Sequence, residues 1–226
     1  MRFAVVVFPG SNCDEDALRA IKSVLNEPVD LIWHQTASLE GYDAVIIPGG
    51  FAYGDYLRAG AIARFAPVIT EVKRLAQAGH PVLGICNGFQ VLTEAGLLPG
   101  ALLPNNHLQF RCDIVGLRVE TTRTPFTADY RAGQQIRLPI AHAQGSYFAD
   151  DAALQELREH DQIVFRYLGG NPNGSVDNIA GIVNRQRNVL GMMPHPERAI
   201  HLLLGSSDGA PIFTSLLRSW KEAVYA

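Results

Sequence analysis

A cysteine flanked by glycines is the feature of this sequence most suggestive of chemistry. Residues 84–88 read Gly-Ile-Cys-Asn-Gly, the spacing of a nucleophile elbow. In that motif the nucleophile occupies a sharp strand-to-helix turn, and the glycines leave room for its strained backbone. Apolar residues precede Cys86 and a helical pattern follows it, which would place the thiol at a helix N-terminus that favours thiolate. We predict a nucleophile here, the alternative being a buried cysteine in a Gly-rich turn.

A thiol nucleophile needs a base, and the base needs an acceptor that orients it. His195 and Glu197 stand in a Pro-His-Pro-Glu segment directly after the apolar residues 190–193. Residues two apart in an extended segment point to the same side, and the prolines stiffen this one. Alone, the segment would equally fit a histidine in a proline turn beside a solvated glutamate. Together with the elbow, it predicts that Glu197 holds the His195 ring while the other ring nitrogen faces Cys86.

Acyl transfer also needs two N–H donors for the oxyanion that forms. The backbone N–H of Asn87, directly after the cysteine, is one candidate. The other is Gly50, in a Gly-Gly pair that follows the apolar residues 44–47. By itself such a pair is equally typical of a plain turn. It is not part of a dinucleotide-binding fingerprint, because no G-x-G-x-x-G follows the first expected strand.

The remaining histidines and cysteines give weaker signals. His142 stands beside Gly145 at the end of an expected strand, where it could line a pocket or be half-exposed. No metal-ligand spacing such as H-E-x-x-H occurs, so no metal site is predicted. For Cys13 and Cys112 the sequence offers no nearby base, and both are interpreted as structural.

The elements that must position these residues alternate between strand and helix in the first half of the chain. Short apolar runs predict buried strands, and apolar residues at helical spacing predict the helices between them. Asn12 is expected to cap the first helix, because Glu15 completes a capping box. The first half is therefore expected to be a parallel α/β unit. Its expected strands are 3–8, 29–33, 44–47 and 81–85, and its expected helices follow Asn12 and cover 62–76 and 87–95.

The second half changes character and predicts longer, more polar strands that extend the sheet in antiparallel fashion. Residues 179–184 and 189–193 flank a polar turn and predict a hairpin. An amphipathic helix is expected at 211–224. Because there is no repeat, linker or low-complexity tract, residues 1–226 are expected to form a single domain. The other strands expected in this half are 110–121, 135–142 and 163–168.

Composition excludes several classes of protein. The chain has 226 residues, 47% of them hydrophobic, which is enough for a sizeable core and argues against disorder. The net charge of −3 does not favour a nucleic-acid binder. Apolar runs are too short for a signal peptide or a membrane span, and three cysteines are too few for a disulfide scaffold. We expect a cytoplasmic protein.

Four segments together resemble the class I, triad-type glutamine amidotransferases. More narrowly, they resemble the family of small, PurQ-type glutaminase subunits of phosphoribosylformylglycinamidine synthase. The elbow and the His-Pro-Glu segment are shared by many class I enzymes, whereas residues 48–58 and 86–90 are more specific to these subunits. The segments are Pro-Gly-Ser-Asn-Cys-Asp at 9–14, Pro-Gly-Gly-Phe-Ala-Tyr-Gly-Asp-Tyr-Leu-Arg at 48–58, Gly-Ile-Cys-Asn-Gly-Phe-Gln at 84–90 and Met-Met-Pro-His-Pro-Glu-Arg-Ala at 192–199.

This resemblance implies a flavodoxin-like fold with a mixed, mostly parallel sheet, and it implies roles for individual residues. Cys86 would attack the side-chain amide of glutamine, His195 would shuttle the proton, and Glu197 would orient His195. The oxyanion would be held by the backbone N–H groups of Gly50 and Asn87. The resemblance also implies that Gln90 helps to hold the substrate, and His142 is added to that group as a candidate.

The resemblance further implies partners, namely a large synthetase subunit and a small bridging subunit. ATP and Mg²⁺ would bind to the synthetase subunit, because this chain has no phosphate loop, and no cofactor is expected in the chain itself. Where the family usually has His-Gly-Glu-Gly, residues 142–145 read His-Ala-Gln-Gly, and residues 105–108 also depart from the family pattern.

One alternative is a DJ-1/PfpI-like hydrolase or stress protein, which shares the scaffold and an elbow cysteine. Those proteins usually place a histidine directly after the cysteine, where this chain has Asn87. A second alternative is a non-catalytic module on the same fold. Such a module would be expected to lose Cys86, His195 or Glu197, and all three are present.

Overall fold

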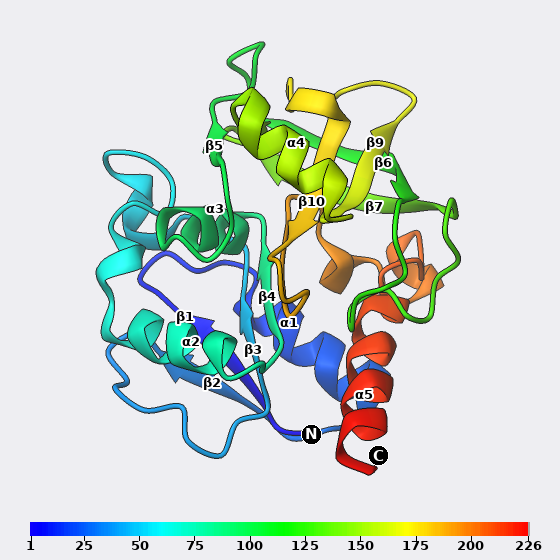
Figure 1. Ribbon diagram of the computed structural model, residues 1–226. Helices are drawn as coiled ribbons and strands as arrows, with labels where there is room; N and C mark the ends of the chain where they lie inside the picture. The colour runs from blue at the N-terminus through cyan, green and yellow to red at the C-terminus, as the bar shows by residue number, and fades with distance from the viewer. Residues whose placement is uncertain (226) are drawn as a thin grey trace.

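A nine-stranded sheet runs through both halves of the protein in the computed structural model, which describes residues 1–225 (Figure 1). The strand order is β2-β1-β3-β4-β11-β10-β9-β6-β7, and a separate pair, β5-β8, lies outside it. The strands of the large sheet are β1 (Phe3–Val7), β2 (Val29–Trp33), β3 (Ala44–Ile47), β4 (Val82–Ile85), β6 (Arg111–Val119), β7 (Gln135–His142), β9 (Ile163–Leu168), β10 (Ile179–Val183) and β11 (Val189–Met192). The pair consists of β5 (Ala101–Leu103) and β8 (Ser146–Phe148).

The first five strands of this order are parallel, and their apolar runs are buried because helices cover both faces. Helices α2 and α3 lie on one side of the parallel strands, and α1 and α5 lie on the other (Figure 1). The helices are α1 (Asp14–Ala20), which continues as a π-helical turn over Ile21–Leu25, α2 (Pro67–Gln77), α3 (Asn87–Glu94), α4 (Asp151–Glu159) and α5 (Ala210–Tyr225). Within residues 1–225, no helix is both long and apolar enough to cross a membrane.

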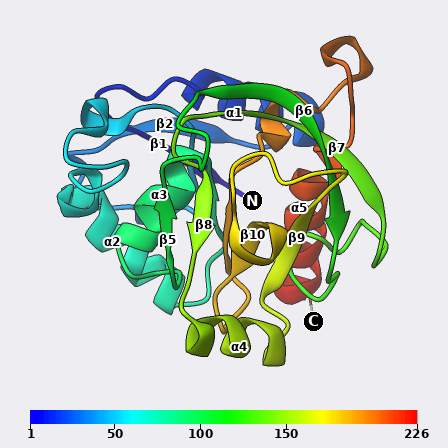
Figure 2. The same ribbon diagram turned by 90° about the horizontal axis from the view of Figure 1, so that it is seen from above.

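Strands β10, β9, β6 and β7 continue the sheet with antiparallel pairing. Figure 2 shows α2 and α3 on one side of the molecule and α5 on the other. The expected hairpin is present, because β10 and β11 pair across the turn at 184–188. The predicted mixed, mostly parallel α/β fold with an antiparallel extension is thus confirmed.

Two predicted helix features are wrong. Asn12 does not cap α1; its N–H bonds the Gly49 carbonyl, and Cys13 is the N-cap with no side-chain hydrogen bond. The helix expected over 62–76 is broken into a 3₁₀ turn at Ala63–Phe65 and then α2. Pro67 begins α2 and disfavours helical backbone at the residue before it. As a result Phe65, which lies within the predicted helix, is 74% exposed.

Strands β5 and β8 and the extent of helix α4 were not predicted. Strands β5 and β8 have three residues each, too short to show a periodic pattern. Helix α4 has a sequence signal, because the Asp150 side chain accepts a hydrogen bond from the Ala153 N–H as an N-cap.

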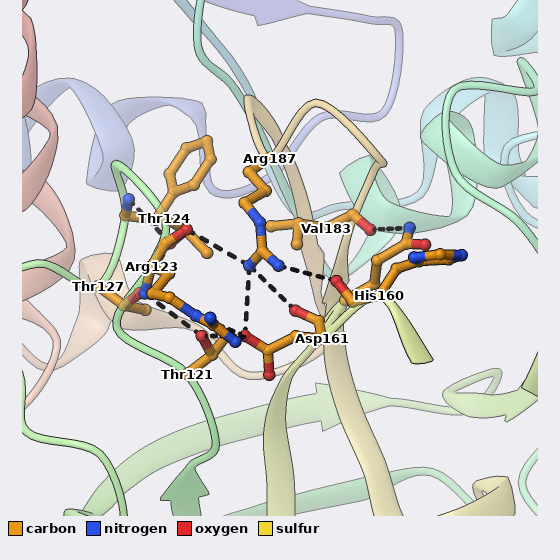
Figure 3. A network of polar contacts seen from close by, with 10 residues as sticks. Thr121, Arg123, Thr124, Thr127, His160, Asp161, Val183 and Arg187 are labelled. Carbon is orange, nitrogen blue, oxygen red and sulfur yellow. Dashed lines mark hydrogen bonds and ion pairs between the residues drawn. The ribbon is translucent and has the colours of Figure 1, made fainter. Parts of the chain in front are cut away.

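A polar network fixes the β10–β11 turn against the rest of the extension (Figure 3). The Arg187 guanidinium donates to the main-chain oxygens of His160 and Asp161 at 2.8 and 3.1 Å. The Asp161 carboxylate in turn accepts from Thr121 at 2.8 Å and from Arg123 at 2.6 Å. Three loops that are remote in sequence are therefore held together by paired charges and hydrogen bonds.

Candidate active site

Sheet register places the predicted site residues at one edge of the molecule. Strand β4 lies between β3 and β11, with Gly84 opposite Ile47 and Ile85 opposite Met192. Because these strands are parallel, the loops that follow them meet at their carboxyl ends. Cys86, the Gly-Gly pair and the Pro-His-Pro-Glu segment are therefore neighbours in space, although they span more than half of the chain.

The strand-to-helix turn at Cys86 has the geometry of a nucleophile elbow. Cys86 has φ 52° and ψ −106°, a strained conformation for a residue with a side chain. A Cβ added at Gly88 would lie 1.9 Å from the Ile47 carbonyl oxygen, and one at Gly84 would lie 2.7 Å from the Gly88 carbonyl oxygen. Both glycines are therefore required by the close approach of backbone, as the motif predicted.

His195 and Glu197 form a buried pair next to the thiol. The His195 Nδ1 lies 2.6 Å from Glu197 Oε1, and the backbone N–H of His195 donates to the Pro139 carbonyl. Within residues 1–225, His195 Nε2 and Glu197 Oε2 are buried without a hydrogen-bond partner. A Cβ added at Gly49 would touch both His195 Cε1, at 2.7 Å, and Cys86 Cβ, at 3.4 Å. Gly49 thus lies beside both the imidazole ring and Cys86, and its lack of a side chain leaves the space between them open.

The electrostatics of this pair favour a charged imidazole. Burial lowers the pKa of His195, but the negative charges of Glu197 and Cys86 outweigh burial and hold that pKa well above its usual value. A protonated His195 beside Cys86 and the Glu197 carboxylate has a proton to give to a leaving group.

The expectation that Cys13 has no base nearby is wrong. Donor atoms of Cys13, His195 and Glu197 all lie within 4.8 Å of one another, and Cys13 is buried. Such a group has the ligand types of a metal site, but here Glu197 Oε1 is already bonded to the imidazole. Cys13 reaches this site because β1 pairs with β3 in parallel, so the segment after β1 lies at the same edge of the sheet. Cys112, by contrast, is exposed on β6.

Both expected oxyanion donors lie next to the cysteine: Gly50 shares a cavity with Cys86, and Asn87 directly follows it. Asn87 is the first residue of α3, where backbone N–H groups have no partner within the helix. Gly50 forms an isolated antiparallel bridge with Ser11, in which Phe51 and Asn12 make the two hydrogen bonds, to Gly10 and Gly49 respectively. In such a pair the N–H of Gly50 itself points away from the partner segment. Its φ of +152° and the tight contacts a Cβ would make restrict the position to glycine.

A cavity of about 240 Å³ opens beside the thiol and contains the two remaining candidate residues. Gln90 and His142 line it, together with Cys86, Gly50 and Asp55. The side-chain amide of Gln90 is held at both atoms. Its Oε1 accepts from the Asn87 side chain at 2.8 Å, and its Nε2 donates to the backbone carbonyl of Gln144 at 2.5 Å. Asp55 belongs to the segment 48–58, but no sequence pattern assigned it a role.

His142 is a fixed, neutral wall of this cavity. Its Nδ1 lies 3.1 Å from Asn105 Oδ1, and its Nε2 lies 3.5 Å from the side-chain nitrogen of Asn173. Burial, followed by the positive charge of His195, lowers the pKa of His142 to about 4. The uncharged ring is compatible with a substrate-lining position but not with a second base working near neutral pH.

Comparison with known proteins identifies the family. Residues 1–211 match the model of the CobB/CobQ-like glutamine amidotransferase domain. A chain in the structure of PurLQS from Thermotoga maritima is 44% identical, with 97% of this chain and 98% of that chain covered and a TM-score of 0.89.

Two more distant structures show the same fold. One is a putative GMP synthase component from Thermoplasma acidophilum, with 18% identity, coverage of 100% and 98%, and a TM-score of 0.66. The other is a glutamine amidotransferase from Thermotoga maritima, with 15% identity, coverage of 100% and 84%, and a TM-score of 0.58. Nothing among these matches favours the DJ-1/PfpI-like alternative. The chain belongs to the CobB/CobQ-like glutamine amidotransferase family, and within it to the PurQ-type glutaminase subunits.

Proposed function

We propose that this glutaminase subunit of phosphoribosylformylglycinamidine synthase hydrolyses glutamine with Cys86 as nucleophile, His195 as acid and base, and Glu197 as the group that orients His195. The observation that carries the proposal is the buried 2.6 Å contact between His195 and Glu197 beside a strained elbow cysteine. Nucleophile, base and orienting acceptor are the three parts that covalent acyl transfer needs.

In the first half of the reaction the Cys86 thiolate attacks the side-chain carbonyl carbon of glutamine. The negative charge that develops on the amide oxygen is held by the N–H groups of Gly50 and Asn87. When the tetrahedral species collapses, the C–N bond breaks and His195 gives its proton to the departing nitrogen, so ammonia leaves and a glutamyl thioester remains. His195 then takes a proton from water, which attacks the thioester and releases glutamate and the thiolate.

The ammonia produced here must reach an acceptor before it escapes as ammonium. The proposed acceptor site lies on a large synthetase subunit, with a small bridging subunit in the same complex. Binding of ATP and Mg²⁺ is proposed for the synthetase, where formylglycinamide ribonucleotide would become the amidine. The cytoplasm is the proposed location of this pathway, and the three free cysteines are compatible with it.

Exposed apolar side chains around the cavity support docking of such a partner. Phe51 lines the cavity and is 48% exposed, and Leu57 in the same loop is 91% exposed. On the other side Leu108, which is 82% exposed, follows Asn105, the residue that holds the His142 ring. Large apolar residues exposed together at one edge are typical of an interaction surface. Because the loop that contains Phe51 also lines the cavity, we expect partner binding to raise the activity of a weak isolated subunit.

The test is release of glutamate from glutamine by the purified chain and by Cys86→Ala. Each is measured alone and with the synthetase subunits, ATP and formylglycinamide ribonucleotide. The proposal predicts Cys86-dependent release that rises sharply when the partners are added. Absence of release under all conditions would contradict the glutaminase mechanism, and full turnover by the isolated chain would contradict the dependence on partners.

A further inference from the structure

The cavity beside Cys86 must match more than the amide of its substrate. Under the proposed glutaminase function, on which this inference rests, the substrate is glutamine. Glutamine carries an α-ammonium group and an α-carboxylate besides the reacting amide. A cation that enters a partly buried cavity loses hydration and needs an anion or several acceptors in return. The charges of the cavity wall therefore indicate where the ammonium end lies.

Asp55 is the one carboxylate among the residues that line this cavity. In the part of the chain that the structure describes, it takes part in no ion pair. Acidic side chains elsewhere in the protein are commonly paired with arginine, as Glu94 is with Arg58 at 2.5 Å. Asp55 is thus a half-buried negative charge that lacks a cation and faces the site of the reaction.

The backbone around Asp55 is unusually constrained. Tyr53, Asp55 and Leu57 all have positive φ, at 56°, 52° and 71°. Non-glycine residues in this region are strained, and such strain concentrates at functional sites. The Asn87 side chain donates to Asp55 Oδ1 at 3.0 Å, which ties the carboxylate to the residue that follows the nucleophile. The loop and the Asn87 side chain therefore fix this carboxylate in the wall of the cavity.

We propose that Asp55 binds the α-ammonium group of glutamine and so selects substrates that are α-amino acids. The amide carbon then lies against Cys86 while the ammonium end lies against the Phe51–Asp55 side of the cavity. Asp55 would be a substrate-binding residue, and its contact with Asn87 would fix the distance between the two ends of the substrate.

Acid–base behaviour gives a second, independent signature. Burial raises the pKa of Asp55 to about 6, although hydrogen bonds from Asn87 and the Gly60 backbone act in the opposite direction. The other titratable groups at the cavity are Cys86 and His142, and Tyr53 lies in the same loop. The pKa of His142 lies near 4 and that of Tyr53 is raised above its ordinary value, so neither of these two changes charge near pH 6. Ammonium binding should weaken as pH falls through about 6, when Asp55 becomes protonated.

The experiment compares glutamine with glutaramate, the same five-carbon amide without the α-amino group. Both are assayed with the complete synthase complex containing the wild-type chain, Asp55→Asn, or the control Asp151→Asn, whose residue is exposed in the first turn of α4. We expect Asp55→Asn to lower kcat/KM for glutamine by ~10–100-fold, mainly through KM, as loss of one hydrogen-bonded charge predicts. Glutaramate turnover should change less than threefold, and the control should match wild type.

Each other outcome has a definite meaning. Equal losses on both substrates would show that Asp55 only positions Asn87, and no loss on either would show that it does not bind substrate; both overturn the proposal. Should Asp55→Asn fail to fold, the wild-type pH profile decides. KM for glutamine should rise below pH 6 while KM for glutaramate stays flat, and parallel profiles overturn the proposal. A wild-type complex that releases no glutamate at all would instead contradict the proposed function.

Discussion

Two polar clusters in this protein differ in whether their buried polar groups have partners within the chain. In the network around Asp161, the Arg187 guanidinium and the Asp161 carboxylate find their partners within the chain (Figure 3). Around Cys86, a buried imidazole nitrogen and a buried carboxylate oxygen have no partner within residues 1–225, and the cysteine itself is strained. Both clusters join segments that are far apart in sequence.

The difference separates a structural cluster from a reactive one. A buried polar group without a hydrogen bond costs free energy, so native structures satisfy nearly all of them. Exceptions persist where the group has another task, and strained backbone concentrates in the same places. The Asp161 network stabilises three loops, and its charged groups are paired with one another. At the Cys86 site two buried groups have no partner in the described residues, which fits the proposed reaction.

The largest effect should follow removal of the nucleophile. Cys86→Ala is expected to lower glutamate release by more than ~10⁴-fold, because the covalent step is lost. The melting temperature should change little, since the thiol is small and its contact with the Ala141 carbonyl is long, at 3.7 Å. Activity measured with the partner subunits, together with a thermal melt, checks both parts. Substantial residual turnover would place the nucleophile elsewhere.

A smaller loss of activity should follow Glu197→Gln. The amide is nearly isosteric but uncharged, so His195 loses its main support for the protonated form, and kcat should fall ~10³-fold. The pKa of His195, now raised by Glu197 and Cys86 against the effect of burial, should decrease. A pH–rate profile should therefore show the deprotonation of His195 at lower pH than in wild type. An unchanged profile would mean that Glu197 does not govern the imidazole.

Gly88→Ala is expected to lower the stability of the protein rather than to remove a reacting group. The new methyl group would lie 1.9 Å from the backbone oxygen of Ile47, which cannot move without disturbing the sheet. We expect a loss of about 3 kcal/mol in the free energy of unfolding, measured by urea denaturation. Gly116→Ala is the matched control, because its nearest contact would be an ordinary 3.4 Å. Equal effects of the two substitutions would remove the steric argument for the elbow.

The smallest effect is expected for Arg187→Ala. This variant tests whether the Asp161 network acts on stability alone. Loss of its bonds to the His160 and Asp161 carbonyls should lower stability by about 2 kcal/mol and leave kcat within twofold of wild type. Arg185→Ala, an exposed arginine in the same turn, serves as the control and should change neither. A fall in kcat would show that the two clusters are coupled.

Local patterns in the sequence were sufficient for the strands of the large sheet and for the turn at Cys86. Apolar runs predicted the strands of the parallel half, and the glycines around Cys86 predicted the elbow, because both depend on neighbouring residues. That residues 1–226 form one domain stays a prediction, which the continuous sheet supports. The roles of Cys86, His195 and Glu197 are likewise proposals, although their side chains do come together.

Features that depend on distant contacts could not be predicted from local patterns. Cys13 reaches His195 only because β1 and β11 lie in the same sheet, and Asp55 reaches the cavity only through a loop of strained residues. Asn12 failed as a helix cap because its backbone is bonded to Gly49 across the sheet edge. In each case tertiary structure decided what the local pattern could not.

The central claim is that Cys86 carries the glutamyl group during turnover. The most direct measurement is acid quench of the active complex with glutamine, followed by peptide mass spectrometry. Cys13 is the internal comparison, because it is a second buried thiol beside the same histidine. The account predicts a glutamyl thioester on the peptide that contains Cys86 and none on Cys13. An adduct on Cys13, or turnover without any adduct, would contradict it.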